Sequence, residues 1–416
     1  MCRKETIMTF FPNLRFPGFD GEWEIRKLRE LVKIYDGTHQ TPNYVSNGIP
    51  FYSVEQVTAN QFEKTKFITP EVFEKENKRV KLEKGDILMT RIGSIGVAKH
   101  INWDVNASFY VSLALIKQSS RIDNEYLCHF INTNFFQSEL WKRTIHVAFP
   151  QKINLGEIGE CFIKYPSSKE QSKISSFLTS IDNRIQTQKK IISQLKSQMS
   201  NLKDLIFEKK LRFKDRNGNI FSQWKYFKLS DLGNTFNGLS GKTKEHFGVG
   251  QKYIQYKQIF DSAKINIANC AFVDVEENEN QNTVQYGDVF FTISSETPEE
   301  IGMSSVLLEN VENVYLNSFC FGFRTNSLDE LIPEFSQFLF RSNKFRNEIV
   351  KLAQGSTRYN MSKTEFLKLN VKLPCKDEQI KIAQFLSSIS EKIYIESELL
   401  IQYENQKKYL LQNLFV

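Results

Sequence analysis

The chain has 416 residues, of which 40% are hydrophobic and 25% are charged, a balance typical of folded proteins with more than one core and unlike that of disordered or collagen-like chains. Lys and Arg outnumber Asp and Glu by 55 to 48, so the net charge of +7 favours a polyanionic partner only weakly. No run of about 18 apolar residues occurs, which argues against a membrane-spanning helix. We therefore expect a soluble, cytoplasmic protein with no membrane partner.

Motifs of metal and phosphate chemistry are missing from the sequence. The cysteines and the five histidines lack the short spacings that zinc and redox sites require, and there is neither a phosphate loop ending in Gly-Lys-Ser/Thr nor an Asn/Asp-Pro-Pro-aromatic tetrapeptide. We expect no metal site and no catalytic residue in this chain. The cysteines are expected to be reduced thiols in the core: Cys2, Cys128, Cys161, Cys270, Cys320 and Cys375.

In chain order, the first structured region is predicted to be rich in short strands. Between residues 23 and 165, Gly and Pro turns separate runs of β-branched and aromatic residues, as at 49–54 and 109–116. Helical stretches follow near 124–142. These patterns predict a mixed α+β domain.

A long helix is predicted next, because apolar residues between Ile174 and Ile206 recur at alternating steps of four and three. At 1.5 Å per residue this segment would form a rod of about 50 Å, longer than a small domain usually needs. Such a rod is suited to act as a spacer.

The region 224–373 repeats the order of the first domain. We predict strands at 253–260, 289–293 and 319–324, and a helix from about 333 to 352. A second long helix then runs to the end of the chain and keeps the apolar phase of the first.

The two halves of the chain are copies of one another. Residues 166–207 align without a gap with residues 374–415, and between these frames the halves differ in sequence and loop length. This pattern indicates one scaffold that carries two different variable modules. Further matching positions are Trp23 with Trp224 and Gly85-Asp86 with Gly287-Asp288.

Charge favours pairing of the two long helices with each other. Residues 165–207 contain seven basic and three acidic side chains, whereas 373–415 contain five basic and six acidic ones. We predict an intramolecular, antiparallel coiled coil; the alternative is that each helix packs on its own half. The predicted seam is Ile174, Leu178, Ile181, Ile185, Leu195, Leu202, Ile382, Leu386, Ile389, Ile393, Leu400 and Leu410.

Four segments follow from these patterns. They are an N-terminal segment with the first module (1–165), a central helix (166–214), a second module (215–373) and a C-terminal helix (374–416). The predicted fold class is α+β: two globular modules separated by two long helices that form an antiparallel coiled coil, with a pseudo-twofold internal repeat.

Several short motifs occur in a characteristic order along both halves. The first half has Asn13-Leu-Arg-Phe-Pro-Gly-Phe19 with Trp23, Asp36-Gly-Thr-His-Gln-Thr-Pro42, Gly48-Ile-Pro-Phe51, Gly85-Asp86-Ile-Leu88 and Arg91-Ile-Gly93. The second half has Gly287-Asp288, Gly355-Ser-Thr357, and Pro374 with Glu378-Gln379. With these motifs the chain resembles, over nearly its whole length, the specificity subunit of type I restriction-modification systems.

This resemblance implies two target-recognition domains that each read one half of a split, asymmetric site on double-stranded DNA. It implies a chain that is not itself an enzyme and that docks two methyltransferase subunits, which use S-adenosylmethionine, and two restriction subunits, which use ATP and Mg²⁺. Two other functions stay open. These are a coiled-coil scaffold that binds only proteins, and a self-contained restriction enzyme.

Readers of duplex DNA use amide, hydroxyl and basic side chains on loops, with Lys and Arg neutralising the phosphates. The first half offers such residues at His39, Gln40, Thr41, Tyr44, Arg91, Ser94, Lys99, Gln151 and Lys152. The second half offers Lys242, Lys244, Gln255, Tyr256, Lys257, Ser294, Ser295, Thr357, Arg358, Tyr359 and Asn360. A basic cluster at 209–214 is either a solvated helix end or a further phosphate contact.

Overall fold

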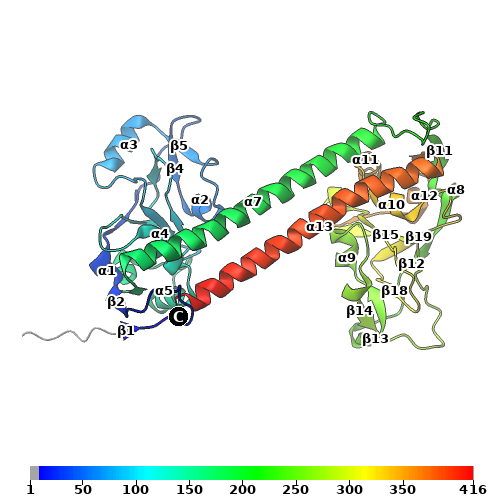
Figure 1. The fold of residues 1–416 in the computed structure, drawn as a ribbon. Helices are drawn as coiled ribbons and strands as arrows, with labels where there is room; N and C mark the ends of the chain where they lie inside the picture. The colour runs from blue at the N-terminus through cyan, green and yellow to red at the C-terminus, as the bar shows by residue number, and fades with distance from the viewer. Residues whose placement is uncertain (1–8, 416) are drawn as a thin grey trace, which may run out of the picture. The chain divides into compact units, whose positions relative to one another are not determined.

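The computed structural model describes residues 9–415, which form two compact units (Figure 1). The first unit comprises the chain up to Lys189 together with the residues from Glu398 onward, and the second comprises Lys190–Ser397. Each unit contains both strands and helices. Across residues 9–415, no helix is both long and apolar enough to cross a membrane.

The strands of the first unit form three small sheets with the orders β1-β2-β10, β3-β9-β6-β7 and β5-β4-β8. Their bounds are β1 Thr9–Phe10, β2 Trp23–Lys27, β3 Ile34–Asp36, β4 Ile49–Tyr52, β5 Lys66–Ile68, β6 Ile87–Thr90, β7 Ala98–His100, β8 Ser108–Phe109, β9 Leu113–Ile116 and β10 Phe162–Tyr165. The short helices are α1 Leu28–Leu31, α2 Val54–Ala59, α3 Pro70–Asn77, α4 Asn124–Ile131, α5 Asn134–Arg143 and α6 Leu155–Gly159.

The second unit repeats this topology with the sheet orders β11-β21, β12-β19-β15-β17 and β14-β13-β18, and adds the pair β16-β20. Its strands are β11 Lys225–Lys228, β12 Gly233–Asn237, β13 Phe247–Ile254, β14 Ala271–Val273, β15 Val289–Thr292, β16 Ser294–Ser295, β17 Ser304–Val306, β18 Tyr315–Leu316, β19 Cys320–Thr325, β20 Tyr359–Asn360 and β21 Asn370–Leu373. Its short helices are α8 Leu229–Leu232, α9 Tyr256–Asp261, α10 Pro333–Leu339, α11 Asn343–Val350 and α12 Lys363–Leu367, with 3₁₀ turns η1 Lys244–His246, η2 Ile267–Asn269 and η3 Pro298–Glu300.

The central strands β6 and β15 are buried along their whole length because both faces of each four-stranded sheet are covered. In β6, Ile87 and Met89 belong to one hydrophobic cluster and Leu88 belongs to another, as the alternation of side chains along a strand requires. In β15, Val289 and Phe291 likewise belong to one hydrophobic cluster and Phe290 to another. Each unit therefore has a core on either side of its main sheet.

A capping residue separates two short helices at equivalent places in the two units. The helical stretches predicted near 124–142 are α4 and α5, and α5 begins where the Thr133 side chain accepts the N–H of Phe136. The single helix predicted at about 333–352 is instead α10 and α11, because the Ser342 side chain accepts the N–H of Phe345 and starts a new helix there.

The strands predicted at 253–260 and 109–116 were too long. Strand β13 ends at Ile254 and helix α9 follows, because Tyr256 and Phe260 stack at helical spacing and Ile259 is buried. The segment 109–116 is divided between β8 and β9.

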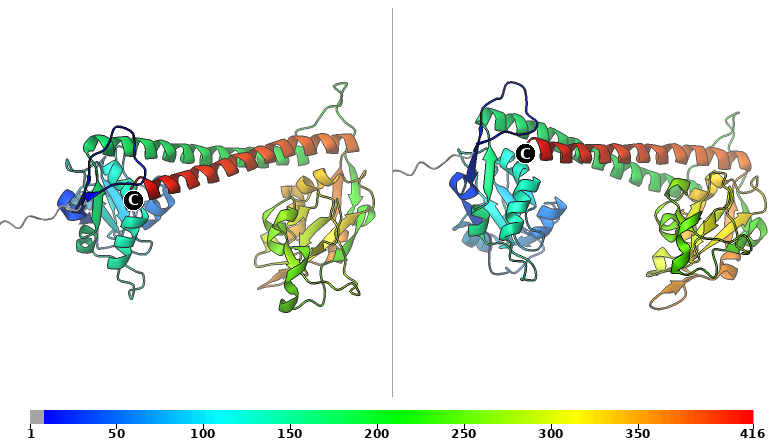
Figure 2. Two further views of the ribbon diagram at one scale, coloured as in Figure 1. Left: turned by 60° about the horizontal axis from the view of Figure 1, so that its bottom comes forward. Right: turned by 90° about the horizontal axis from the view of Figure 1, so that it is seen from below.

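The two long helices are α7, Ser168–Phe207, and α13, Lys376–Asn413, and they lie side by side in each unit (Figures 1 and 2). In the first unit, Asp182 pairs with Lys407 at 2.5 Å and Lys189 pairs with Glu404 at 2.8 Å. Residue numbers rise along α7 as they fall along α13, so the pairing is antiparallel. The predicted α+β class with an internal repeat and paired long helices is confirmed.

Most predicted seam residues lie in the cores. The part of α7 in the first unit buries Ile174, Leu178, Ile181 and Ile185 against Leu400 and Leu410, and in the second unit Ile382 and Leu386 are buried with Ile389 and Ile393 packed beside them. Leu195 and Leu202 are half-buried, as Ile389, Ile393 and Leu400 are, but they lie outside the hydrophobic clusters of the two cores. In that part of α7, Ile192, Met199 and Ile206 are buried at intervals of seven residues, together with Phe207.

The Glu-Gln dipeptide that opens each long helix has a structural role. Glu170 and Glu378 are buried, and each accepts two hydrogen bonds from an arginine, Arg15 in the first unit and Arg212 in the second. The neighbouring glutamines accept backbone N–H groups at the start of α4 and α10, at 2.8 and 3.0 Å. Long helix and domain are thereby held together by buried, charge-assisted bonds.

Each core is completed by an aromatic residue at the end of a long helix or just beyond it. Phe415 is fully buried, with its ring 6.4 Å from Trp23 and 5.6 Å from Phe130. At the matching position Phe207, at the end of α7, packs on Trp224 and Phe335. The end of each helix therefore belongs to the unit that does not contain its beginning.

Of the described cysteines, Cys128, Cys161, Cys270 and Cys320 are free and buried, as expected. Cys375 is exposed, just before α13 begins, so the expectation of a core thiol is wrong there. Cys2 lies outside the described residues.

The substitution Phe415→Ala should lower the free energy of unfolding of the first unit by about 3–5 kcal/mol, because it empties a fully buried aromatic site. Hydrogen exchange can separate the two units: protection should fall in β2 and α4 and stay unchanged in β11 and α10. Phe149→Ala, at a fully exposed ring, is the matched control and should cost less than about 0.5 kcal/mol. Equal loss of protection in both units would contradict this account of the core.

Candidate nucleic-acid interface

Six of the predicted binding residues line one cleft in the second unit, with a volume of about 760 Å³. They come from three places in the chain: α9, β16 and the loop before β20. Strand β16 pairs with β20 through Ser294 and Asn360, which brings that loop beside the sheet. The six residues are Tyr256, Lys257, Ser294, Ser295, Thr357 and Arg358.

The cleft has a fixed floor and an exposed rim. Ser294 is buried and accepts hydrogen bonds at its backbone carbonyl from the Tyr256 hydroxyl, at 2.7 Å, and at its hydroxyl from Arg358, at 3.3 Å. The Arg358 guanidinium is exposed and lies 5.8 Å from the ring of Phe319, itself 56% exposed. A cation beside an exposed ring can contact both a phosphate and a base.

The other predicted residues of the second unit are spread more widely. The Lys242 ammonium is buried and bonded to Glu279, and this bond is the main reason why the pKa of Glu279 falls to about 2. It is therefore occupied within the fold, unlike Lys244, which is exposed. Gln255 precedes α9 as its N-cap residue, and Tyr359 is half-buried in β20.

Arg91 is a structural residue in the first unit. Only 8% of it is exposed, and its guanidinium donates to the carbonyls of Val111, at 2.9 Å, and Ile153, at 3.2 Å. The carboxylate of Asp36 lies 3.7 Å away. Burial lowers the pKa of Arg91. The expectation that Arg91 reaches DNA therefore does not fit its position, because its donors are used to hold neighbouring loops.

The loop between β3 and β4 presents the remaining early residues. His39, Gln40, Thr41 and Tyr44 are exposed there. His39 pairs with Asp36 at 2.8 Å, and the Thr41 hydroxyl lies 3.0 Å from that of Tyr110. The ring of Tyr44 lies 6.0 Å from that of Phe51, so three of these four side chains are partly fixed by neighbours while still facing solvent.

A second group in the first unit surrounds Lys152. Lys152 is exposed and forms isolated β-bridges with Ile92 and Ile145, and the Gly93 N–H donates to the Gln151 carbonyl at 2.8 Å. Ser94, in the adjoining turn, is also exposed. The structure thus brings Ser94, Gln151 and Lys152 together.

This group matches the cleft of the second unit. There Asn360 bridges to Ser294 and to Gln354, just as Lys152 bridges to Ile92 and Ile145. The loops 146–151 and 355–359 are therefore equivalent parts of the repeated scaffold. Sequence reasoning missed the exposed apolar residues here, Val147, Phe149 and Phe319. Their apolar character alone gave no signal, because an aromatic residue in a loop is as compatible with a core position.

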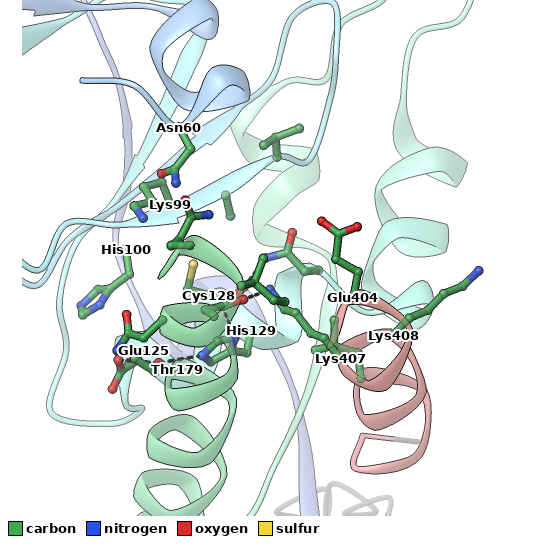
Figure 3. Close-up of a pocket in the computed structure, with 18 of the residues that line it drawn as sticks. Asn60, Lys99, His100, Glu125, Cys128, His129, Thr179, Glu404, Lys407 and Lys408 are labelled. Atoms are coloured by element: carbon green, nitrogen blue, oxygen red, sulfur yellow. Dashed lines mark hydrogen bonds and ion pairs between the residues drawn. The ribbon is translucent and has the colours of Figure 1, made fainter. Parts of the chain in front are cut away.

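Lys99 lies elsewhere, in a cleft of about 580 Å³ between α2, β7, α4 and the long helices of the first unit (Figure 3). Its lining includes Lys407, paired with Asp182, and Lys189, paired with Glu404. Positive and negative charges offset one another in this cleft. The same holds for the cleft of the second unit, where Asp261, Glu296 and Glu300 line the wall together with Lys257 and Arg358. No group of three or more possible metal ligands occurs in the part of the chain that the structure describes.

The imidazole of His129 forms one wall of this cleft and bonds to the Thr179 hydroxyl at 3.0 Å (Figure 3). Its burial lowers the pKa of His129 to about 4, although Asp182 acts in the opposite direction. The ring is therefore neutral at physiological pH.

A sequence model for the type I restriction modification DNA specificity domain matches the chain twice, at residues 20–197 and 222–405. The chain belongs to this family. The two matches follow the internal repeat and cover both loop clusters.

Curated relatives agree with this assignment. The MjaVIII specificity subunit of Methanocaldococcus jannaschii is 27% identical over 211 residues, 47% of this chain and 48% of that protein, so the match spans about half of that relative. The EcoKI specificity subunit of Escherichia coli K12 is 20% identical over 386 residues, 87% of this chain and 81% of that subunit. Both are named as specificity subunits of type I restriction enzymes.

Solved structures share the fold. The S subunit of a type I restriction-modification system from M. genitalium aligns with a TM-score of 0.62 at 14% identity, covering 98% of this chain and 99% of that one. A chain from a study of the assembly of a type I system aligns with a TM-score of 0.55 at 14% identity, covering 96% and 98%. At such identities the likeness extends to the fold alone.

The first unit should lose stability as the pH falls from about 6.5 to about 4, because the unfolded chain protonates His129 in this range while the folded chain resists. At about 1.4 kcal/mol per pH unit, the contribution is roughly 3 kcal/mol. His129→Gln should abolish this part of the pH dependence, measured as urea midpoints at pH 7.5 and 5. His39→Gln, at an exposed ring, should retain it. Equal losses in the wild type and His129→Gln would contradict the assignment.

Proposed function

We propose that this specificity subunit reads a bipartite, asymmetric site on double-stranded DNA, with one half-site for each unit. The observation that carries the proposal is that two units of the same topology present different side chains at equivalent loops. Loop 355–359 reads Gly-Ser-Thr-Arg-Tyr, whereas loop 146–151 reads His-Val-Ala-Phe-Pro-Gln. One scaffold with two unlike reading surfaces suits an asymmetric site, because identical surfaces would favour a symmetric one.

Within each unit, exposed and buried polar residues are assigned different roles. Arg358, Thr357 and Lys257 in the second unit, and Lys152 with Ser94 in the first, are the proposed contacts to bases and phosphates. Buried groups such as Arg91 and Ser294 hold these loops in place. A DNA contact needs hydrogen-bond donors that face solvent, whereas the buried groups already form hydrogen bonds within the protein.

The chain is proposed to be non-catalytic and to act in the cytoplasm within a larger assembly. Two methyltransferase subunits would supply adenine methylation with S-adenosylmethionine, and two restriction subunits would supply ATP- and Mg²⁺-dependent cleavage. The family membership and the named relatives support this assembly. The paired long helices are proposed to set the spacing between the half-sites.

Arg358→Ala should relax base preference in one half of the methylated motif and leave the other half unchanged. The measurement is adenine methylation mapped across a genome after co-expression of the full chain with its methyltransferase subunit. A bidentate contact from arginine to a base contributes about 1–3 kcal/mol of discrimination. The ratio of the methylation rate at the cognate site to that at sites with another base at the contacted position should therefore fall by tens of times.

The matched control is Lys351→Ala, which removes one positive charge from an exposed side chain of the same unit. It should leave the motif intact. Relaxed base preference in both halves of the motif would contradict the assignment of one half-site to each unit. No methylation by the intact pair would favour the scaffold reading, and DNA cleavage by the purified chain with Mg²⁺ would favour a self-contained enzyme.

Lys152→Ala should weaken binding of all duplexes by a similar factor and leave the methylated motif unchanged, because a lysine at this exposed position would neutralise a phosphate. The slope of log K against log salt should become shallower by about 1. Fluorescence anisotropy of the assembled complex on cognate and random duplexes at several salt concentrations measures both effects. An altered motif with an unchanged slope would instead make Lys152 a base contact.

A further inference from the structure

The loop 146–151 of the first unit holds two apolar side chains in solvent. Val147 is 98% exposed and Phe149 is 103% exposed, values that mean almost no contact with the rest of the chain. Just before this loop, Trp141 is 64% exposed and its ring lies 4.1 Å from that of His146. Apolar side chains that stay in water forgo the favourable free energy of burial. Contact with a partner surface would explain why these side chains are exposed.

The base of this loop is firmly fixed. The Ile145 N–H donates to the Lys152 carbonyl at 2.8 Å, and the Gly93 N–H donates to Gln151 at 2.8 Å. The Ile153 N–H donates to the Arg91 carbonyl at 3.0 Å, while the Arg91 guanidinium donates back to the Ile153 carbonyl. The tip is thus carried on a base anchored by several backbone bonds.

The scaffold itself does not require an apolar tip. In the equivalent loop of the second unit the exposed residues are Gly355, Ser356, Thr357 and Arg358. Both loops have the same β-bridges at the base, but the side chains at their tips differ in chemical character. The tip of loop 146–151 is therefore adapted to the target of the first unit.

The immediate neighbours of the tip favour DNA as that target. Lys152, Gln151 and Ser94 lie at its base, a basic, an amide and a hydroxyl group of the kinds that bind phosphates and base edges. A tip of two apolar side chains is also much smaller than the roughly 800 Å² that each partner of a stable protein interface buries. Apolar side chains of this size are used by DNA-binding proteins as wedges between base pairs.

We propose that Val147 and Phe149 form a wedge that inserts between neighbouring base pairs of the first half-site and unstacks them. This rests on the proposed function, because it assumes that the first unit reads DNA. The wedge would add recognition through the deformability of DNA, because base-pair steps with a low free energy of unstacking would bind most tightly. It also assigns the two units different modes of reading, by insertion in the first and by polar contacts in the second.

The test uses the full chain assembled with its methyltransferase subunit and the cognate duplex found by methylation mapping. The half-site of the first unit is the half that Arg358→Ala leaves unchanged. 2-Aminopurine is placed in turn at each position of that half-site except the methylated adenine, so that any base flipping by the partner does not contribute. Wild-type complex should raise the fluorescence at one step, because stacking quenches this base.

Phe149→Ala should abolish the fluorescence rise and weaken cognate binding by roughly ten- to hundred-fold, the loss typical of an aromatic side chain stacked on a base. Phe149→Trp should restore both. Tyr226→Ala, at a ring of the second unit that is 69% exposed, is the matched control and should change neither.

Three outcomes would overturn the wedge. The first is a fluorescence rise that persists in Phe149→Ala, and the second is the absence of any rise in a wild-type complex that methylates a bipartite motif. The third is failure of Phe149→Ala to co-purify with the methyltransferase subunit, which would make the tip a protein-docking surface. A wild-type pair that methylates no bipartite motif would instead reject the proposed function, so the two failures are distinguishable.

Discussion

Phe415 is buried among Trp23, Tyr126 and Phe130, and Phe207 occupies the matching place beside Trp224. Because each ring sits at the end of a helix that begins in the other unit, neither core is complete without a segment from the distant half of the sequence. The loops 146–151 and 355–359 depend on this arrangement. They are attached to sheets whose inner face is covered by the same clusters that these rings fill.

Two of the motifs that relate the chain to its family, Gly-Asp and Glu-Gln, serve the scaffold. Gly85 and Gly287, with φ of +96° and +88°, form the turns that lead into β6 and β15. The following aspartates, Asp86 and Asp288, are buried and accept backbone N–H groups across those turns. A buried carboxylate needs several donors, so each is also bonded to a basic side chain. The basic partners are Lys117 and Arg324.

A scaffold with this many buried polar bonds tolerates change at its tips. The loops 146–151 and 355–359 share the bridges at their base but no chemistry at their ends, and their exposed side chains contribute little to folding. Substitution at the tips can therefore leave cores, caps and ion pairs as they are. The two units of this chain already differ in that way.

Sequence alone determined the internal repeat, the α+β class and the antiparallel pairing of the long helices, because apolar periodicity and charge balance are local properties of a helix. It placed several polar loop residues correctly at the surface. Only the tertiary structure decided which polar groups are available: Arg91, Lys242 and Ser294 are turned inward by bonds to distant residues, whereas Phe149 is left in water. Exposure depends on neighbours brought together by folding, and residue type does not encode it.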